Sequence, residues 1–334
     1  MNNLTLFTLV LSSSYLMTFL GTHILIKKLS FLHEKKLEES EIFFGQDMAK
    51  PGMKLVPMMG GLAITFGFGL SILASLKFVT KASVVTLLAG LVTILLIAIL
   101  GFLDDIFIVR RIWRITLPGI AALPLIVVDT GIPILHLLGY GLNLGYVYTY
   151  FFIPIGVIAC ANLINILAGF NGLEAGSGAI ACTAIFTSST ILMKLEPTKY
   201  SVTTPIIMLA MLGACLAFLI FNWYPAKIFP GNVGTYAIGA SIASAVIIGD
   251  MEKIAVIALI PQIVEFCLKM RGGFKAGNFG TLVNGSLAYK DKVSSLTHLF
   301  MKYTRVNERM LVSYLLVIQA IFGSLAVWSI FWYR

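Results

Sequence analysis

The stretch LLIAILGFLDD, residues 95–105, ends a long apolar run with two adjacent aspartates, Asp104 and Asp105. The run reaches back to residue 82, so it can cross a bilayer as one helix. Three arginines follow the pair: Arg110, Arg111 and Arg114. Carboxylates beside a membrane helix are costly unless they lie at its edge or in a wet cavity. Such a pattern suits a site for phosphates and a metal ion, whereas a charged helix end with topology-determining arginines is the simpler interpretation.

The composition of the whole chain indicates a membrane protein. Of its 334 residues, 58% are hydrophobic and 12% are charged, whereas a soluble domain carries about 25% charged residues. Ten apolar stretches can enter or cross a bilayer. They cover residues 4–26, 57–76, 82–103, 115–128, 147–167, 177–193, 203–222, 234–249, 252–268 and 310–332. The sequence therefore predicts an all-α polytopic protein with about ten transmembrane helices and a single domain over residues 1–334.

The basic residues predict the orientation of these helices. The odd-numbered connections between the stretches hold 18 Lys and Arg residues, and the even-numbered connections hold 5 when Lys253, at the very start of the ninth stretch, is included. Because cytoplasmic connections are enriched in Lys and Arg, the odd connections are predicted to be cytoplasmic, with both termini outside. The net charge of +9 fits contact with an anionic cytoplasmic leaflet. No basic stretch with interleaved aromatic residues suggests a nucleic-acid partner.

The fifth apolar stretch ends in a segment rich in Asn and Gly, residues 162–176. Asn162 and Asn165 are three positions apart, so they share one face of a helix. Gly169 and the glycines after it allow the backbone to approach a ligand closely. This composition, without Lys or Arg, favours a binding site, and a helix end followed by a polar turn is the alternative.

Three further segments combine polar or basic residues with glycine. Asn232 lies in FPGNVGT (229–235), just before an apolar helix, where it can supply an oxygen to a cation or simply cap the helix. Lys50, in the first connection, can meet a phosphate or anionic lipid. Arg271 begins a glycine-rich loop that can fold over an anionic ligand or remain a surface loop.

The predicted topology places these groups on one side of the membrane. Because chance would scatter them over both faces, their convergence indicates a phosphate-handling active site at the cytoplasmic surface. The residues concerned are Asp104, Asp105, Arg114, Asn165, Asn171, Asn232 and Arg271.

Taken in order, the motifs resemble those of a known family. The chain has Gln-Asp-x-x-Lys from residue 46, Pro-x-x-Gly-Gly from residue 57, the Asp-Asp pair, Asn-x-x-Asn-x-x-Ala-Gly-x-Asn-Gly-Leu-Glu from residue 162, and Asn-Trp-Tyr-Pro from residue 222. This combination resembles the polyprenyl-phosphate N-acetylhexosamine-1-phosphate transferases, and most closely the dolichyl-phosphate GlcNAc-1-phosphate transferases of eukaryotes and archaea. The resemblance covers nearly the whole chain.

The resemblance implies a ten-helix fold and a reaction that depends on Mg²⁺, with Mn²⁺ as an alternative ion. A polyprenyl or dolichyl phosphate attacks the β-phosphorus of UDP-GlcNAc, or of a related UDP-N-acetylhexosamine, and UMP leaves. The product begins the assembly of a glycan, by this resemblance an N-glycan. The membrane is the plasma membrane of an archaeon or the endoplasmic reticulum of a eukaryote, and a homodimer is compatible with the resemblance.

The resemblance also implies roles for individual residues. Asp104 and Asp105 match the catalytic pair, and Asn165 and Asn232 occupy the positions of metal ligands. The family usually has Asp where this chain has Asn232. The implied UDP-sugar-binding residues are Gln46, Asp47, Met48, Gly169, Asn171, Phe229 and Arg271. The candidates for binding the lipid phosphate are Arg114, Lys50 and Asn162.

Other functions stay open from the residues alone. A transporter of lipid-linked sugars or ions would carry charges deep within several spans, whereas Glu265 is the main such residue here. A catalytically inactive, lipid-binding homologue is suggested by the neutral Asn232. A CDP-alcohol phosphatidyltransferase is disfavoured because its Asp-Gly-x-x-Ala-Arg signature is absent from the sequence.

Overall fold

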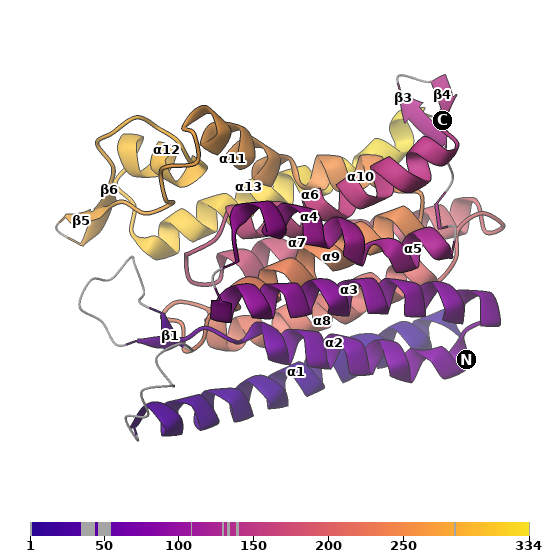
Figure 1. The fold of residues 1–334 in the computed structure, drawn as a ribbon, viewed down its shortest axis with the longest axis horizontal. Helices are drawn as coiled ribbons and strands as arrows, with labels where there is room; N and C mark the ends of the chain where they lie inside the picture. Colours follow the sequence, from indigo (N-terminus) through magenta and orange to yellow (C-terminus); the bar gives the residue numbers. More distant parts are fainter. Residues whose placement is uncertain are drawn as a thin grey trace.

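Long helices run side by side and form a bundle (Figure 1). The structure, a computed structural model, describes residues 2–34, 44–45, 55–107, 109–128, 130–131, 134–137, 140–283 and 285–333. Its α-helices are α1 (Asn3–Glu34), α2 (Gly61–Ser75), α3 (Lys81–Phe107), α4 (Arg111–Ala121), α5 (Leu123–Val127), α6 (Ile153–Ile166), α7 (Leu173–Leu195), α8 (Thr203–Asn222), α9 (Gly231–Ile248), α10 (Glu252–Ala258), α11 (Ile260–Arg271), α12 (Leu296–Tyr303) and α13 (Glu308–Trp328). Short 3₁₀ or π turns are η2 (Leu76–Phe78), η3 (Tyr148–Phe152) and η4 (Ser329–Tyr333).

Among the described residues, eight helices are long and apolar enough to cross a membrane. They correspond to eight of the ten predicted stretches, and the polytopic class is thereby supported. The other two stretches, 115–128 and 252–268, form the interrupted pairs α4–α5 and α10–α11. In both pairs a proline, Pro124 or Pro261, stands at the start of the second helix, where its missing N–H interrupts the helical hydrogen bonds. A count of ten spans stays a prediction.

Three two-stranded antiparallel hairpins add to the helices that the sequence predicts. They are β1 (Phe44–Gly45) with β2 (Val56–Pro57), β3 (Ile134–Leu137) with β4 (Tyr140–Asn143), and β5 (Thr281–Val283) with β6 (Ser286–Ala288). All three lie in connections between helices, so the bundle itself is all-α as predicted. The sequence between β5 and β6 contains Asn-Gly, a dipeptide typical of tight hairpin turns.

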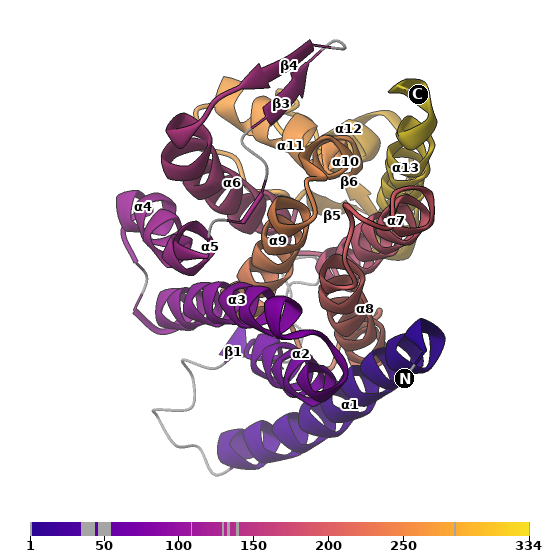
Figure 2. The same ribbon diagram turned by 90° about the vertical axis from the view of Figure 1, so that its right-hand side faces the viewer.

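Helix α9 lies at the centre of the bundle when it is viewed end-on (Figure 2). It packs against α3, α6 and α8, and most of its residues are buried. Small residues make this close packing feasible. A Cβ atom at Gly239 would lie 2.2 Å from the carbonyl oxygen of Cys160 in α6, and one at Gly61 would lie 2.1 Å from the backbone nitrogen of Gly234.

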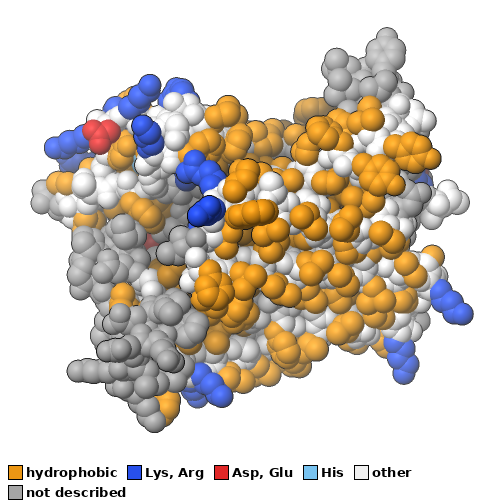
Figure 3. Space-filling view, in the orientation of Figure 1, with side chains coloured by type: hydrophobic (Ala, Val, Ile, Leu, Met, Phe, Trp, Pro, Cys, Tyr) orange, Lys and Arg blue, Asp and Glu red, His pale blue; other side chains and the backbone are white. Residues whose placement is uncertain are grey.

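Apolar side chains cover the outer face formed by α3, α4 and α5 (Figure 3). Exposed examples are Ile99, Ile120 and Val127. Such a surface suits lipid contact, because exposed apolar area of this extent is unusual in a soluble protein. Both chain ends lie at one end of the bundle, away from the lobe of β5, β6 and α12 (Figure 1).

Candidate active site

The start of α9 is held by a carboxylate from α3. Asp105 Oδ1 accepts a hydrogen bond from the Asn232 backbone N–H at 2.9 Å, and its Oδ2 accepts one from the Val233 N–H at 3.1 Å. The first N–H groups of a helix lack partners within the helix, and the helix dipole favours an anion there. Asp105 therefore caps α9 from another helix. The structure contradicts the simple capping role considered for Asn232, because Pro230 is the N-cap residue.

Asp104 is buried, and both of its oxygens have partners. Its Oδ1 lies 2.8 Å from Arg114 Nε and accepts a hydrogen bond from the Val109 N–H at 3.0 Å. Its Oδ2 accepts from Asn232 Nδ2 at 3.1 Å and from the Tyr236 hydroxyl at 3.4 Å. A buried carboxylate is stabilised only when it is paired and hydrogen-bonded, so Arg114 and Asn232 are the groups that hold Asp104 in place.

Two amide side chains join α6 to this cluster. Asn165 Nδ2 donates to Asn232 Oδ1 at 3.0 Å. Since Asn232 in turn donates to Asp104, one chain of polar contacts runs from α6 through α9 to α3. The structure thus brings together Asp104, Asp105, Arg114, Asn165 and Asn232, as the sequence predicts.

Glycine permits the close approach of α3 to α9 at this point. A Cβ atom at Gly101 would lie 2.6 Å from the carbonyl oxygen of Asn232. Gly231 has a φ of +66°, and a Cβ there would lie 2.6 Å from Asp105 Oδ2. Both positions require glycine for the carboxylate pair to reach the start of α9.

Arg114 offers part of its guanidinium group to a ligand. Its Nε donates to the Val109 carbonyl at 2.8 Å and also contacts Asp104. The side chain is 34% exposed, whereas the Asp104 side chain is 1% exposed. With Nε engaged, the terminal nitrogens are the atoms available to bind a phosphate, which is the interaction a guanidinium makes best.

A small cavity beside Asp104 and Arg114 lies next to an apolar groove. The cavity has a volume of about 40 Å³ and is lined by Trp113 and Tyr236 as well as by the ion pair. The groove, of about 730 Å³, runs between α3 and α4–α5. Leu100 and Leu117 line both. Asp104 therefore lies beside a cavity that shares part of its wall with the apolar groove.

The turn after α6 has a left-handed backbone conformation at Gly169, and residues from α7 and from the segment after α11 hold it by hydrogen bonds. Gly169 has a φ of +109°, and a Cβ there would lie 2.6 Å from the Phe279 ring. Its N–H donates to Glu174 Oε1 at 2.7 Å. The carbonyls of Ile166 and Ala168 accept from Asn278 Nδ2. This turn is therefore held by hydrogen bonds from two other segments, and its place in the uridine pocket stays a prediction.

Asn171 lies inside the protein rather than at its surface. Its exposed fraction is 1%, its side-chain nitrogen donates to Glu308 Oε1, and its Oδ1 accepts from the Ala226 N–H at 2.6 Å. The next residue, Gly172, donates to Asn222 Oδ1 at 3.1 Å. In this structure Asn171 thus links the turn to α13 and to the 223–230 connection, and a contact with nucleotide stays a prediction.

The remaining predicted site residues lie at the edges of this region or outside it. The Phe229 carbonyl accepts from the Gly60 N–H at 2.9 Å, which ties the 223–230 connection to α2. Asn162 donates to the Ile158 carbonyl within its own helix, and Arg271 is exposed and donates to the Val293 carbonyl. The structure does not bring Asn162 or Arg271 into the Asp104 cluster. Four candidates lie outside the described residues: Gln46, Asp47, Met48 and Lys50.

The residues around Asp104 are chemically suited to hold Mg²⁺. The cluster offers carboxylate and amide oxygens from Asp104, Asn165 and Asn232, which are the hard ligands that Mg²⁺ prefers. Within the described ranges, no group of three or more His, Cys, Asp or Glu side chains forms a metal cage. A site of this kind suits an ion that takes few protein ligands and completes its shell with substrate phosphates and water.

Sequence reasoning missed several residues of this region. Tyr236 lies four positions after Asn232, on the same helix face, so helical spacing is a signal that identifies it. Glu174 and Glu308 reach the turn after α6, but only the fold reveals these contacts. Asn278 and Lys269 reach the end of α6 from a segment more than a hundred residues away, with no local signal.

The chain is similar to several known proteins. Residues 87–250 match the model of glycosyl transferase family 4. A protein of Saccharolobus solfataricus, provisionally named a UDP-N-acetylglucosamine–dolichyl-phosphate N-acetylglucosaminephosphotransferase, is 40% identical over 287 residues, covering 85% of this chain and 87% of that protein. The enzyme of that name from Schizosaccharomyces pombe is 33% identical over 199 residues, covering 55% of this chain and 44% of that protein. A phospho-N-acetylmuramoyl-pentapeptide-transferase of Halalkalibacterium halodurans is 31% identical over 264 residues, covering 69% of this chain and 76% of that protein.

Proposed function

The chain belongs to glycosyl transferase family 4, and from this we propose that it transfers GlcNAc-1-phosphate from UDP-GlcNAc to dolichyl phosphate. The products would be dolichyl-diphosphate-GlcNAc and UMP, and the reaction would begin the assembly of a lipid-linked N-glycan precursor. The names of its archaeal and eukaryotic relatives support the donor and the acceptor.

One structural observation carries this proposal. Asp104 and Arg114 form an ion pair at the edge of the bundle, directly beside the amides of Asn165 and Asn232. Phosphoryl transfer needs anionic substrates to be brought together, so a site must combine cations, oriented donors and a place for a metal ion. The cation Arg114, the donors of Asn165 and Asn232, and the oxygens that could bind a metal ion support a site of this kind.

The proposed reaction forms one P–O bond and breaks another. An oxygen of the dolichyl phosphate attacks the β-phosphorus of UDP-GlcNAc, and the bond from that phosphorus to the bridging oxygen breaks. UMP leaves with the bridging oxygen. If the lipid phosphate arrives as a monoanion, its proton passes to a carboxylate, for which Asp104 Oδ2 is the candidate.

Each residue of the cluster has a distinct role in this proposal. The terminal nitrogens of Arg114 bind the lipid phosphate, and Asp104 orients Arg114 through the 2.8 Å contact. Asp105 keeps the start of α9 in place and with it Asn232. Asn165 and Asn232 would hold Mg²⁺, or Mn²⁺ as an alternative, together with substrate oxygens. When bound, the ion would neutralise charge on the attacking and leaving oxygens.

A lipid acceptor agrees with the surroundings of the cluster. The apolar groove between α3 and α4–α5 shares the lining residues Leu100 and Leu117 with the Asp104–Arg114 cavity. A prenyl chain needs an apolar path from the bilayer to the reacting phosphate, and the cost of leaving lipid grows with each exposed methylene. We place the site on the cytoplasmic face of the plasma membrane or the endoplasmic reticulum, where UDP-sugars are available.

The direct test is an assay with purified protein. With UDP-GlcNAc, dolichyl phosphate and Mg²⁺, the protein should release UMP and form one lipid-linked sugar per UMP. Omission of either substrate should abolish the product. A matched panel of UDP-sugars fixes the donor. Uptake of a lipid-linked sugar into vesicles without UMP release would instead favour a transporter, and binding without turnover would favour an inactive homologue.

The orientation has its own test. Single cysteines placed at Asn2 and Lys36 in a Cys267→Ser background should differ in labelling of intact cells, because Cys267 is the exposed native cysteine among the described residues. Label at position 2 and protection at position 36 would agree with external termini. The reverse pattern would overturn the proposed cytoplasmic site.

A further inference from the structure

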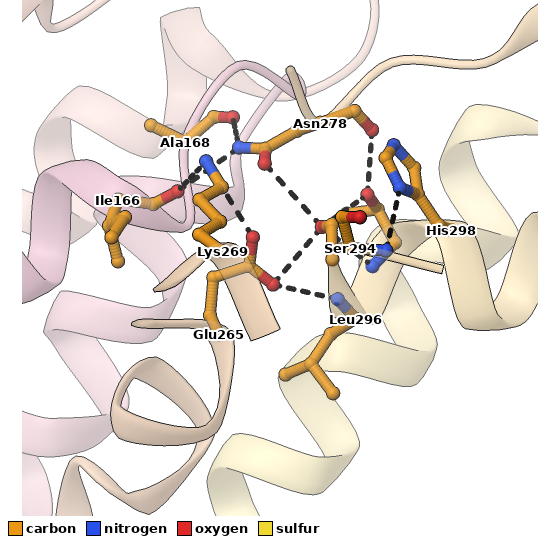
Figure 4. A network of polar contacts seen from close by, with 10 residues as sticks. Ile166, Ala168, Glu265, Lys269, Asn278, Ser294, Leu296 and His298 are labelled. Atoms are coloured by element: carbon orange, nitrogen blue, oxygen red, sulfur yellow. Dashed lines mark hydrogen bonds and ion pairs between the residues drawn. The ribbon is translucent and has the colours of Figure 1, made fainter. Parts of the chain in front are cut away.

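The C-terminal end of α6 is capped by side chains from a distant segment (Figure 4). Lys269 Nζ donates to the Ile166 carbonyl at 2.8 Å, and Asn278 Nδ2 donates to the carbonyls of Ile166 and Ala168 at 3.2 and 2.6 Å. The last carbonyls of a helix have no partner within the helix, and a cation near them is favoured by the helix dipole. Residues 269 and 278 supply these partners from outside α6.

Asn278 is also fixed by its own surroundings. It is buried, its backbone carbonyl accepts from Thr297 Oγ1 at 2.6 Å, and its Oδ1 accepts from Ser295 Oγ at 3.4 Å. All of its side-chain atoms that can form hydrogen bonds are thereby used. The orientation of the amide is therefore determined, with the NH₂ group directed at α6.

A buried carboxylate joins this arrangement to the start of α12. Glu265 Oε2 accepts from Ser295 Oγ at 3.0 Å and from the Leu296 N–H at 2.7 Å, and its Oε1 lies 3.6 Å from Lys269 Nζ. Burial lowers the pKa of Lys269, and the attraction of Glu265 offsets part of this effect. The ion pair thus connects α11, α12 and the end of α6.

The capped end of α6 carries two parts of the proposed donor site. Asn165 stands immediately before Ile166, and the Gly169 turn immediately follows Ala168. The neighbour of Asn278, Phe279, packs against Gly169, where a Cβ atom would lie 2.6 Å from the ring. The connection after α11 therefore supports the backbone of the turn and the end of α6 on which Asn165 lies.

We propose that Asn278 is a positioning residue for the UDP-sugar, acting through the carbonyls of Ile166 and Ala168. The proposal rests on the proposed function, because it takes the turn at Gly169, which the family resemblance implies in UDP-sugar binding, as the donor side of that reaction. A site on a fixed turn binds its ligand without first ordering the backbone, so the loss of the two hydrogen bonds weakens donor binding more than it slows turnover.

The test compares two buried amides that each donate to a backbone carbonyl. Asn278→Asp keeps the shape and the oxygen near Ser295 but removes both donors to α6. Gln319→Glu is the matched control, because Gln319 Nε2 donates to the Ala258 carbonyl at 2.7 Å within α10 and α13, away from the turn. Both substitutions remove buried hydrogen bonds, but only Asn278→Asp removes hydrogen bonds to the turn that we assign to the donor.

Asn278→Asp should raise the KM for UDP-GlcNAc by about ten- to thirtyfold, the effect of losing two hydrogen bonds, with a smaller change in kcat. It should also reduce the rise in thermal stability that UDP-GlcNAc confers on the protein. Gln319→Glu should lower thermal stability and leave the KM unchanged. If the carboxylates prevent folding, Asn278→Ala and Gln319→Ala are compared by the same measurements.

An unchanged KM in folded Asn278→Asp or Asn278→Ala would overturn the proposal, and so would an equal rise in the KM of the Gln319 variants. A wild-type protein that releases no UMP from UDP-GlcNAc would instead contradict the proposed function. The two failures are therefore separate.

Discussion

The two helix ends that meet at the candidate site are both capped from elsewhere, but in opposite ways. The start of α9 is capped by Asp105, an anion on the rigid helix α3. The end of α6 is capped by Lys269 and Asn278, a cation and an amide from α11 and the segment that follows it. The α9 end is therefore fixed by the bundle itself, whereas the α6 end depends on a connection outside the bundle. In the function that we propose, the first end carries the phosphate chemistry and the second end carries the fit of the nucleotide.

The strongest test of this division is Asp105→Asn. An amide has one acceptor oxygen, so it can satisfy only one of the two N–H groups at the start of α9, and it removes the charge that the dipole favours. Turnover should fall strongly, because Asn232 loses its support at the start of α9. Asp104→Asn, which removes the candidate proton acceptor, should lower turnover by roughly 10²–10⁴, the range for a positioned acid–base group. Steady-state UMP release from purified, folded variants measures this. Near-normal rates in both would leave only a structural helix end.

A smaller effect is expected at the other helix end from Gly169→Ala. The added methyl group would meet the Phe279 ring, and a φ of +109° is strained for any residue but glycine. The KM for UDP-GlcNAc should rise roughly tenfold, for a cost on the order of 1–2 kcal/mol. Gly285→Ala is the control, because Gly285 also has a positive φ but nothing lies near its Cβ position. Equal effects of the two changes on KM would remove the special role of the turn.

The amide at 232, where the two ends touch, should change the response to Mg²⁺ by several-fold. Asn232→Asp places a second carboxylate 3.1 Å from Asp104, an arrangement that needs a cation. The Mg²⁺ concentration for half-maximal activity should fall, and Mg²⁺ should stabilise this variant against heat more than it stabilises the wild type. Asn232→Ala should raise the half-maximal concentration. Identical Mg²⁺ curves for all three proteins would exclude Asn232 as a ligand.

The smallest effect is expected from replacing the ion pair behind the α6 cap by neutral residues. In Glu265→Gln with Lys269→Met, Asn278 still donates to both carbonyls, and a buried ion pair exchanged as a pair is often nearly neutral in stability. The KM for UDP-GlcNAc should change by no more than about threefold, since one of three hydrogen bonds to α6 is lost. A change as large as that of Asn278→Asp would transfer the positioning role to Lys269.

The sequence was a good guide to the bundle and to the cluster around Asp104. Apolar length predicts most spans because the membrane requires it, and motif spacing places Asp104, Asn165 and Asn232 at neighbouring helix ends. The interruptions in α4–α5 and α10–α11 follow from prolines within apolar runs that read as continuous. Their effect depends on whether neighbouring helices satisfy the freed carbonyls, which composition does not reveal.

The partners of the polar residues were much less predictable. Asp105 bonds to backbone groups 127 and 128 residues away, and Asn278 bonds to carbonyls 112 and 110 residues away. Contacts of this separation are set by how helices pack, and no local pattern encodes them. For the same reason Asn171 reads as a ligand in the sequence, yet it is engaged with Glu308 inside the protein.

Backbone meets backbone where α2 and α3 cross α9. The nearest atoms to a Cβ at Gly61 belong to Gly234, and those to a Cβ at Gly101 belong to Asn232. Proteins that carry cargo across a bilayer rock one half against the other, and the sliding surfaces must exchange their contacts at each cycle. Where helices touch through their main chains, glycine is required on at least one of them, and few side-chain contacts are available for exchange. Direct contact between main chains at these two crossings therefore favours an enzyme whose helix ends keep one arrangement while the substrates come to it.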